Sequence, residues 1–594
     1  MNQHLANMVR ERAKLYAERD VFIYKEGEET EYKKLSWNDL IKATDNVSKS
    51  LLSLGFGHES KIGIFSNNSE KWTISDLGIL SIRGVVVPFF GTSSKHQVKY
   101  IVDETQMKVM FVGNKEQLEK ALWVVENSET LEKIVVLENN VSTEDGRCMS
   151  WTEFCNLGND QKYDASLKQL LEAAKTDDLA TIIYTSGTTG EPKGVMLDHK
   201  NFIGSFKSHD LRLDVSESDV SLCFLPLSHI FERAWTFYLL HCGAVNCFLS
   251  NPRKVIDALP IVKPTVMCTV PRFYEKTFDA IISEKEKWPT LKQNIFNWAI
   301  NVGRNCIKYK KDAKRIPFAL QIKNSIADKL VFKTIKKILG GNFRFLPCSG
   351  AAMRPELLRF FHAAGVFINY GYGATETTAT VSCFKSDIYN FDACGSIMPG
   401  VSVKISDDGE IMIKGDTIFK GYYNKPEETA KTLQDGWYKS GDEGFISEDG
   451  YLVMTDRIKD LMKTSGGKYI SPQKMELLAS ENPFIEQIIV IGDGRKFVSA
   501  LIVPEFENLK KAAKNLGIKT QDAKNLVLND KIINFIKEKI DAFQEELPKY
   551  ERIVKFTLLP EPFSIENDAL TSTLKMKRKL ITEQYKDLID KIYE

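Results

Sequence analysis

The sequence predicts an α/β fold, with a large N-terminal domain of parallel-sheet α/β layers and a small, mobile α+β domain at the C-terminus. Over the first 180 residues, short apolar segments alternate with helix-like segments, which is the pattern of βαβ units. At 594 residues the chain is too long for a single hydrophobic core. A short charged segment that begins at Asp456 separates this region from a second folded part.

Apolar runs predict the strands of the N-terminal region. These strands are residues 61–65, 84–90, 134–137 and 179–184, followed by a later set at 245–249, 266–270, 343–347 and 366–370. Between the first two strands, residues 69–83 predict a helix, with Ser69 as its N-cap and Glu70 in its first turn.

Between Glu284 and Gly340 the pattern changes to long helices, which we interpret as a helical insertion in the N-terminal domain. One apolar stripe at helical spacing comprises Ile295, Trp298, Ala299, Val302 and Cys306. A second helix is predicted from 318 to 339. The basic run 308–315 between them has two interpretations. One is a solvated loop, which we favour, and the other is a patch that attracts anionic lipid headgroups or a phosphate-rich ligand.

The C-terminal part mixes helices and strands in a small α+β pattern. Helices are predicted at 473–480, 506–516 and 531–546, and strands at 485–491 and 497–503. We therefore divide the chain into an N-terminal domain (1–456) and a C-terminal domain (462–594), joined by the charged segment 457–461.

Composition narrows the class of protein. A formal net charge of +1 gives no indication of nucleic acid or of a strongly acidic partner. Ten cysteines without a CxxC pair favour reduced thiols in the cytoplasm over a disulfide framework or a zinc cluster. Residues 1–20 lack the apolar centre of a signal peptide, and no apolar run approaches the ~20 residues of a membrane-spanning helix. Any membrane contact is therefore expected to be peripheral, at a membrane surface.

The most informative segment is residues 184–194, which read YTSGTTGEPKG after an apolar strand. Glycines allow a tight turn and bring backbone N–H groups close to an anion. Hydroxyl groups add donors, and Lys193 adds a positive charge. Such clusters also occur in ordinary loops, but the order, the density and the terminal lysine favour a polyphosphate site. The spacing is not that of the common P-loop.

Two further motifs follow predicted strands, where open α/β sheets bind ligands. Residues 369–376 read NYGYGATE, in which the glycines permit close backbone approach, Tyr372 offers a flat face for an adenine, and Glu376 offers a carboxylate suited to Mg²⁺. Residues 347–352 read PCSGAA, and their small side chains leave room for a ligand.

Together these motifs resemble those of the adenylate-forming (AMP-binding) superfamily, and within it most closely those of long-chain fatty acid–CoA ligases. Residues 226–233, PLSHIFER, resemble a block typical of those ligases. The resemblance extends from about residue 184 to the C-terminus and implies a set of nucleotide-binding positions. These are Thr185, Ser186, Gly187, Thr188, Thr189, Gly190, Lys193, Gly350, Ala351, Ala352, Gly371, Tyr372, Gly373, Ala374 and Thr375.

The resemblance also assigns roles to later residues. In WYKSGD (437–442) it implies that Asp442 accepts hydrogen bonds from both ribose hydroxyls, which suits the two oxygens of a carboxylate. In the segment 455–472, it implies that Arg457 contacts the nucleotide and that Lys459 is the hinge. The pair Gly466–Gly467 resembles the loop that enters the site for thioester formation.

Four residues are implied to take part in catalysis: Lys575, Glu376, Thr375 and His229. Lys575 lies in a Lys-x-x-Arg pattern, and Thr573–Leu574 replace the Ser-Gly that most members carry before it, which is a departure shared by long-chain ligases. Lys577 is the alternative in register. Glu376 is the implied magnesium ligand. His229 is expected to line the junction of the acyl and nucleotide sites.

The expected function is the ATP-dependent activation of a long-chain fatty acid to an acyl adenylate, followed by thioester formation with coenzyme A. The expected cofactors are ATP, Mg²⁺ and coenzyme A as co-substrate, with no nucleic-acid partner, and a homodimer is compatible with the sequence. Three alternatives stay open: a ligase for medium-chain or aromatic acids, an acyl-AMP ligase that delivers to a carrier protein, and a non-catalytic nucleotide-binding protein.

Overall fold

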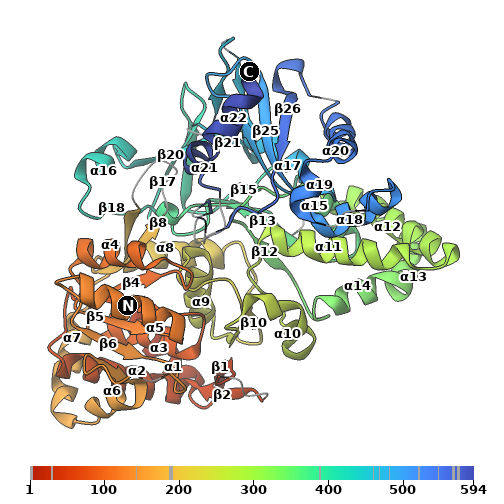
Figure 1. The fold of residues 1–594 in the computed structure, drawn as a ribbon. Coiled ribbons are helices and arrows are strands. Elements are labelled where there is room, and N and C mark those ends of the chain that lie inside the picture. The colour runs from red at the N-terminus through yellow and green to blue at the C-terminus, as the bar shows by residue number, and fades with distance from the viewer. Residues whose placement is uncertain are drawn as a thin grey trace.

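The structure, a computed structural model, has a large N-terminal α/β region and a smaller C-terminal one (Figure 1), as the sequence predicts. It describes residues 4–27, 31–141, 143–185, 192–386, 389–458, 461–466, 468–480, 482–519, 522–545, 547–564, 567, 569–570 and 576–594. No helix among these residues is long and apolar enough to cross a membrane.

An eight-stranded sheet in the order β18-β9-β8-β4-β3-β5-β6-β7 forms the first large layer. Its strands from β8 to β7 run parallel, while β9 and β18 are antiparallel to their neighbours. The bounds are β3 (Lys61–Phe65), β4 (Val85–Phe89), β5 (Val109–Val112), β6 (Lys133–Val136), β7 (Cys148–Ser150), β8 (Leu179–Thr185), β9 (Lys193–Asp198) and β18 (Gly421–Tyr422).

Alternating side chains bury both faces of this sheet. Val109 and Phe111 join a core cluster with α1 (Leu5–Tyr16), α2 (Trp37–Ser53) and α3 (Glu70–Ser81). Met110 and Val112 face a second cluster with α4 (Lys95–Thr105) and α5 (Lys115–Asn127). Ser69 caps α3 by accepting a hydrogen bond from the Trp72 N–H at 3.1 Å, as predicted.

Two four-stranded sheets extend the N-terminal region, in the orders β10-β11-β1-β2 and β12-β13-β14-β15. Their bounds are β1 (Asp20–Tyr24), β2 (Lys33–Ser36), β10 (Val220–Cys223), β11 (Val245–Phe248), β12 (Leu346–Cys348), β13 (Ile368–Tyr372), β14 (Ser382–Cys383) and β15 (Ser396–Ile397). The predicted strand at 266–270 is wrong: Val266 and Thr269 form only isolated parallel bridges to Phe345 and Cys348. This segment is buried but does not form a continuous ladder.

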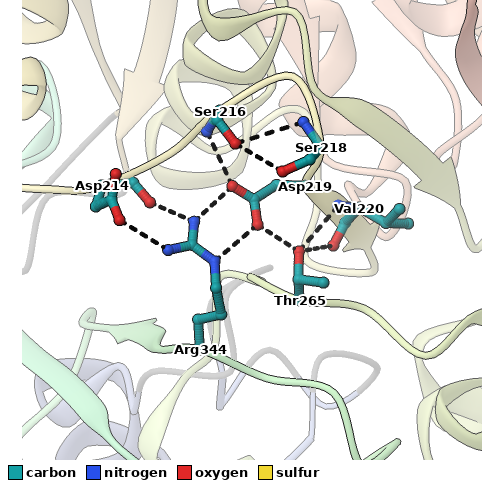
Figure 2. A network of polar contacts seen from close by, with 7 residues as sticks. All are labelled: Asp214, Ser216, Ser218, Asp219, Val220, Thr265 and Arg344. Atoms are coloured by element: carbon teal, nitrogen blue, oxygen red, sulfur yellow. Dashed lines mark hydrogen bonds and ion pairs between the residues drawn. The ribbon is translucent and has the colours of Figure 1, made fainter.

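Figure 2 shows a polar network at the N-terminal ends of three neighbouring segments. Asp219 precedes β10, Thr265 precedes the segment 266–270, and Arg344 precedes β12. The Asp219 carboxylate accepts hydrogen bonds from the Arg344 guanidinium at 2.6 and 3.0 Å, from the Thr265 hydroxyl at 2.6 Å and from the Ser216 N–H at 2.9 Å. Burial raises the pKa of Asp219, but these donors outweigh it and hold that pKa below its ordinary value.

A fourth sheet, in the order β16-β17-β20-β19 with β21 beside β20, completes the N-terminal region. Its strands are β16 (Val401–Ile405), β17 (Glu410–Gly415), β19 (Leu433–Gln434), β20 (Trp437–Ile446) and β21 (Leu452–Arg457). Other helices of the N-terminal region are α6 (Trp151–Leu157), α7 (Asp164–Ala173), α8 (His199–Asp210), α9 (Ile230–Cys242), α10 (Val255–Val262), α15 (Pro355–Ala363) and α16 (Pro426–Thr432).

The predicted helical insertion extends to one side of the molecule (Figure 1). It consists of α11 (Pro271–Glu286), α12 (Thr290–Lys310), α13 (Phe318–Ala327), a π-helical segment η3 (Asp328–Phe332) and α14 (Lys333–Ile338). The last three continue one another as a single helical run over 318–338. The basic run 308–315 is not all loop, because α12 continues through Lys310.

The C-terminal part has its own sheet, β24-β25-β26, with helices on both faces. Ile488 and Val490 pack in a cluster with α17, α18 and α20, and Ile489 and Ile491 in another with α21 and α22. The bounds are β22 (Met462–Lys463), β23 (Tyr469–Ile470), α17 (Pro472–Ala479), β24 (Ile485–Ile491), β25 (Val498–Pro504), α18 (Phe506–Asn515), α19 (Ala523–Val527), α20 (Asp530–Phe543), β26 (Ile553–Leu558), α21 (Arg578–Gln584) and α22 (Lys586–Tyr593).

Candidate nucleotide and acyl site

The predicted phosphate loop joins the antiparallel strands β8 and β9. Ser186, Gly187, Thr188, Thr189 and Gly190 lie outside the described residues. The two residues that flank them, Thr185 and Lys193, are cross-strand partners, and the Thr185 hydroxyl lies 3.5 Å from the Lys193 carbonyl oxygen. The hairpin therefore holds both ends of the loop together.

Lys193 is held by two residues that sequence reasoning did not single out. Its ammonium donates to the Glu428 carboxylate of α16 at 2.6 Å and lies 5.3 Å from the centre of the Tyr422 ring. The lysine is thus oriented by an anion and an aromatic face.

The predicted NYGYGATE motif begins within β13, and Glu376 lies in the short turn after that strand. Its carboxyl group accepts a hydrogen bond from the Tyr422 hydroxyl at 2.9 Å, and its backbone carbonyl accepts one from the Phe419 N–H at 2.9 Å. Burial raises the pKa of this half-buried carboxyl, although the hydrogen bonds act in the opposite direction.

The segment 419–423 links Glu376 to the phosphate loop. Tyr422 lies opposite Val195 in the β18–β9 ladder, and the Tyr423 N–H donates to the Gly194 carbonyl at 2.8 Å. Two predicted motifs, separated by about 180 residues, are therefore brought together by a strand that neither motif contains.

The backbone between Gly371 and Glu376 is tightly packed. A Cβ atom at Gly373 would lie 1.4 Å from the Ala379 carbonyl oxygen, and one at Gly371 would lie 2.3 Å from that of Ser382. Ala379 itself has φ 81°, a left-handed conformation that is unfavourable for a residue with a side chain. Ala374 is half-buried and Thr375 is buried in the short turn that follows.

Tyr372, Asp442 and Arg457 form a second polar group. The Tyr372 hydroxyl donates to the Asp442 carboxylate at 2.5 Å, and the Arg457 guanidinium lies 3.2 Å from the other carboxylate oxygen. Burial and the neighbouring Asp442 raise the pKa of Tyr372, which keeps its hydroxyl a donor. The adenine-stacking role predicted for the Tyr372 ring stays a prediction; the residue is 8% exposed.

The small-residue turn after β12 exposes Gly350, Ala351 and Ala352 at the surface. Gly350 has φ +93°, which favours glycine. A cavity of about 30 Å³ lies beside this turn and is lined by Cys348, Phe231, Ala234, Trp235, Tyr238 and other residues of β12, β13, α8 and α9. The PCSGAA turn, the NYGYGATE motif and helix α9 therefore enclose a mainly apolar space.

His229 stands at the N-terminus of α9 and caps it, because its Nδ1 accepts a hydrogen bond from the Phe231 N–H at 3.1 Å. Two fully buried ionisable side chains follow it. Arg233 donates to both oxygens of Asp76, at 2.6 and 2.8 Å. Glu232 accepts a hydrogen bond from the Leu225 N–H at 3.2 Å and interacts with the Cys223 thiol, and burial raises its pKa to about 8.

The C-terminal residues of the predicted set are the least described. Gly466 is exposed in the hairpin between β22 and β23. Lys459, Gly467 and Lys575 lie outside the described residues.

Comparison with known proteins identifies the family. The AMP-binding enzyme family matches residues 9–423, and the AMP-binding enzyme C-terminal domain matches residues 459–594. This chain belongs to the AMP-binding enzyme family. Long-chain-fatty-acid–CoA ligase FadD15 of Mycobacterium tuberculosis is 32% identical over 553 residues, which cover 91% of this chain and 89% of the relative. Long-chain-fatty-acid–CoA ligase 1 of Cavia porcellus is 30% identical over 595 residues, covering 95% and 82%.

Solved structures share the fold of this AMP-binding enzyme. An anthranilate CoA ligase in complex with anthranoyl-AMP has a TM-score of 0.72 at 17% identity, covering 99% of this chain and 98% of that one. The O-succinylbenzoate coenzyme A synthetase of Bacillus subtilis, in complex with ATP and magnesium ion, has a TM-score of 0.65 at 19% identity, covering 96% and 98%. The predicted fold class and family are thereby confirmed.

The structure places two residues in the site that were not predicted from the sequence, Tyr422 and Glu428. They lie in a stretch, GYYNKPEE, whose local sequence predicts only a short strand and a helix N-terminus with Pro426 in its first turn. Their position beside Glu376 and Lys193 depends on the pairing of β18 with β9, which no local signal reveals.

We predict that Gly373→Ala weakens ATP binding at least tenfold and lowers the free energy of unfolding by about 1–3 kcal/mol, because the new methyl group overlaps a backbone carbonyl. Calorimetric titration and thermal unfolding measure the two effects. Gly146→Ala is the matched control, since nothing lies within 4 Å of a Cβ atom there. Wild-type ATP affinity in Gly373→Ala would contradict the tight packing described above.

We predict that Glu232→Gln removes a pH dependence of stability. The Glu232 pKa is about 8 in the folded state and 4.5 in its ordinary state, so its contribution to stability is complete below pH 4.5 and is lost as the pH rises through 8. The wild type should therefore lose stability relative to Glu232→Gln between pH 5 and pH 9. Thermal unfolding of both proteins at these pH values measures it, and parallel profiles would refute a protonated Glu232.

Proposed function

We propose that this protein is an AMP-forming long-chain fatty acid–CoA ligase. The observation that carries the proposal is the junction at Tyr422, which places Glu376 next to the strand that leaves the phosphate loop. A lysine, a carboxyl group and a glycine-rich loop at one place suit a magnesium nucleotide. The long-chain relatives reported above support the choice of acid.

The reaction overcomes the low electrophilicity of a carboxylate. In the first step the fatty acid carboxylate attacks the α-phosphorus of ATP, a phosphorus–oxygen bond breaks, and pyrophosphate leaves. In the second step the thiol of coenzyme A attacks the carbonyl carbon of the acyl adenylate, AMP leaves, and the thiol proton is released. Because both reactants of the first step are anions, stabilisation of negative charge should dominate catalysis.

Different residues of the site would bind the different parts of the nucleotide and the fatty acid carboxylate. Lys193 and the donors of residues 185–190 would bind the phosphates, and the Asp442 carboxylate would accept hydrogen bonds from the ribose hydroxyls. Arg457, 3.2 Å from Asp442, would orient that carboxylate and lie beside the nucleotide. Thr375 and the backbone of residues 371–374 would pack against the nucleotide, and Lys575 would bridge the carboxylate and the α-phosphate.

Mg²⁺ fits this set of donors as a metal shared with the nucleotide. Among the described residues, no group of three or more His, Cys, Asp or Glu side chains is arranged to hold a metal. A single carboxylate such as Glu376, together with phosphates and water, is the donor set in which Mg²⁺ commonly binds. The ion would supply charge neutralisation of the phosphates, and the Tyr422 hydroxyl would orient the Glu376 carboxylate toward it.

The two steps require two arrangements of one site. We divide the chain into an adenylation domain (1–456), a hinge (457–461) and a lid domain (462–594), with rotation about Lys459. That rotation would withdraw Lys575 and present the Gly466–Gly467 face. The separate hydrophobic clusters within 5–452 and 462–592 support two bodies that could move independently.

The apolar cavity beside the small-residue turn supports an acyl site next to the nucleotide. Each buried methylene contributes about 0.8 kcal/mol, so an apolar pocket favours a long chain. Since the cavity measures about 30 Å³, far below the roughly 300–1,000 Å³ of a small-molecule site, side chains such as Trp235 would have to move to admit an acyl chain.

The proposed setting is cytoplasmic, with peripheral contact at a membrane surface. The homodimer that is compatible with the sequence also stays a prediction, and light scattering coupled to size-exclusion chromatography would test it.

The direct test is AMP release with a ladder of fatty acids, from medium to long chains and including an aromatic acid, with and without coenzyme A. We expect coenzyme A-dependent AMP release that is greatest for long chains, and exchange of labelled pyrophosphate into ATP that requires a fatty acid. Exchange without coenzyme A turnover would indicate delivery to a carrier protein instead. No exchange with any acid would refute the proposed function.

We predict that Lys575→Ala lowers the rate of adenylate formation at least 100-fold while sparing thioester formation from supplied acyl adenylate, because the lysine would stabilise charge only in the first step. Rapid-quench assays of the two half-reactions measure the difference. Lys577→Ala is the matched control, because Lys577 is the alternative to Lys575 as the catalytic lysine. Equal loss of both half-reactions in Lys575→Ala would contradict the proposed division.

A further inference from the structure

The helical run 318–338 carries large apolar side chains on its exposed surface. Phe318, Ile322, Ile326 and Leu330 follow one another at four-residue intervals and are 77%, 49%, 45% and 59% exposed, and Ile338 is 37% exposed. Of the residues of α13, only Ala327 is buried. Single exposed apolar residues are common on protein surfaces, but a row of them along one helix indicates an interaction site.

The same part of the chain concentrates positive charge. Residues 290–340 contain twelve lysine and arginine residues against two aspartates, whereas the whole chain has a formal net charge of +1. Both aspartates already pair with lysines: Asp312 with Lys311 and Lys314, and Asp328 with Lys336. Along the run, exposed lysines that form no ion pair with a described carboxylate are Lys323, Lys329, Lys333 and Lys337.

From this combination we propose that the run 318–338, with the basic segment 308–315 before it, docks on the surface of an anionic lipid bilayer. An amphipathic helix that is rich in lysine lies in the plane of such a surface, with its apolar side chains in the acyl boundary and its ammonium groups among the phosphates. This placement needs no membrane-spanning helix, in agreement with the described helices.

Other occupants fit the surface less well. A second copy of the chain would bring two basic surfaces face to face, and like charges oppose such an interface. Nucleic acid would satisfy the lysines, but binding to its phosphate backbone gives no role to the exposed apolar row. An anionic bilayer satisfies both features at once.

The test is flotation of the purified full-length protein with vesicles of phosphatidylcholine alone or of phosphatidylcholine mixed with phosphatidylglycerol. We expect binding to the anionic vesicles and little to the neutral ones. One variant replaces lysines with glutamine at 323, 329, 333 and 337, and another replaces Phe318, Ile322 and Leu330 with glutamine. The first should lower the partition coefficient at least 100-fold, and the second at least tenfold.

Matched controls carry the same changes on other surfaces. Glutamine replaces Lys14, Lys42, Lys115 and Lys168 in one control, and the exposed residues Leu15, Leu211 and Leu528 in the other. Both controls should bind vesicles like the wild type. All variants should melt as the wild type does, because every replaced side chain is exposed.

Vesicle flotation uses no nucleotide or fatty acid, so its outcome is separate from that of the ligase assay. Absence of wild-type binding to anionic vesicles would overturn the proposal, as would equal binding by the run variants and the controls. Two results would assign the surface to another partner and also overturn it. These are dimer dissociation in the run variants and tighter binding to duplex DNA than to vesicles.

Discussion

The hydrogen bond from the Tyr422 hydroxyl to the Glu376 carboxyl is the contact on which the arrangement of the site depends. It joins the turn after β13 to β18, and β18 in turn pairs with the strand that leaves the phosphate loop. Burial makes the charged form of Glu376 unfavourable, and the Tyr422 hydroxyl partly offsets that effect, because a hydrogen bond to a charged group is stronger than one between neutral groups. The ring of the same tyrosine lies 5.3 Å from the Lys193 ammonium, so one side chain contacts both the Glu376 carboxyl group and Lys193.

Helix α9 shows how buried charge fixes the wall of the cavity. Arg233 is paired through two hydrogen bonds to Asp76 on α3, and this pairing fixes the rotation of α9 about its axis. Phe231 and Ala234, which flank this arginine and its neighbour Glu232, then face the cavity. Burial raises the pKa of the adjacent Glu232, and no ion pair with a described cation offsets that effect.

Much of the fold could be predicted because burial and helix capping leave local signals. The apolar runs that form β3 and β4, the cap at Ser69 and the apolar stripe of α12 are such local signals. The segment 266–270 could not be predicted in the same way, since an apolar run indicates burial but does not specify hydrogen-bonded neighbours. The end of α12 was also predicted too early, because the buried Cys306 and Ile307 keep the helix in place as it enters the basic run. At the site, motif glycines and carboxylates were identifiable, whereas Tyr422 and Glu428 depend on strand pairing between distant parts of the chain.

The π-helical segment η3 has a geometric consequence for the run 318–338. On a continuous α-helix, side chains four residues apart drift around the axis by about 40° at each step, so a row would spiral to roughly the opposite side within twenty residues. A wider turn in the middle accommodates more residues per revolution and winds the later part of the row back. If the same residues were wound as a regular α-helix throughout, the end of the row near Ile338 would swing away from its beginning at Phe318.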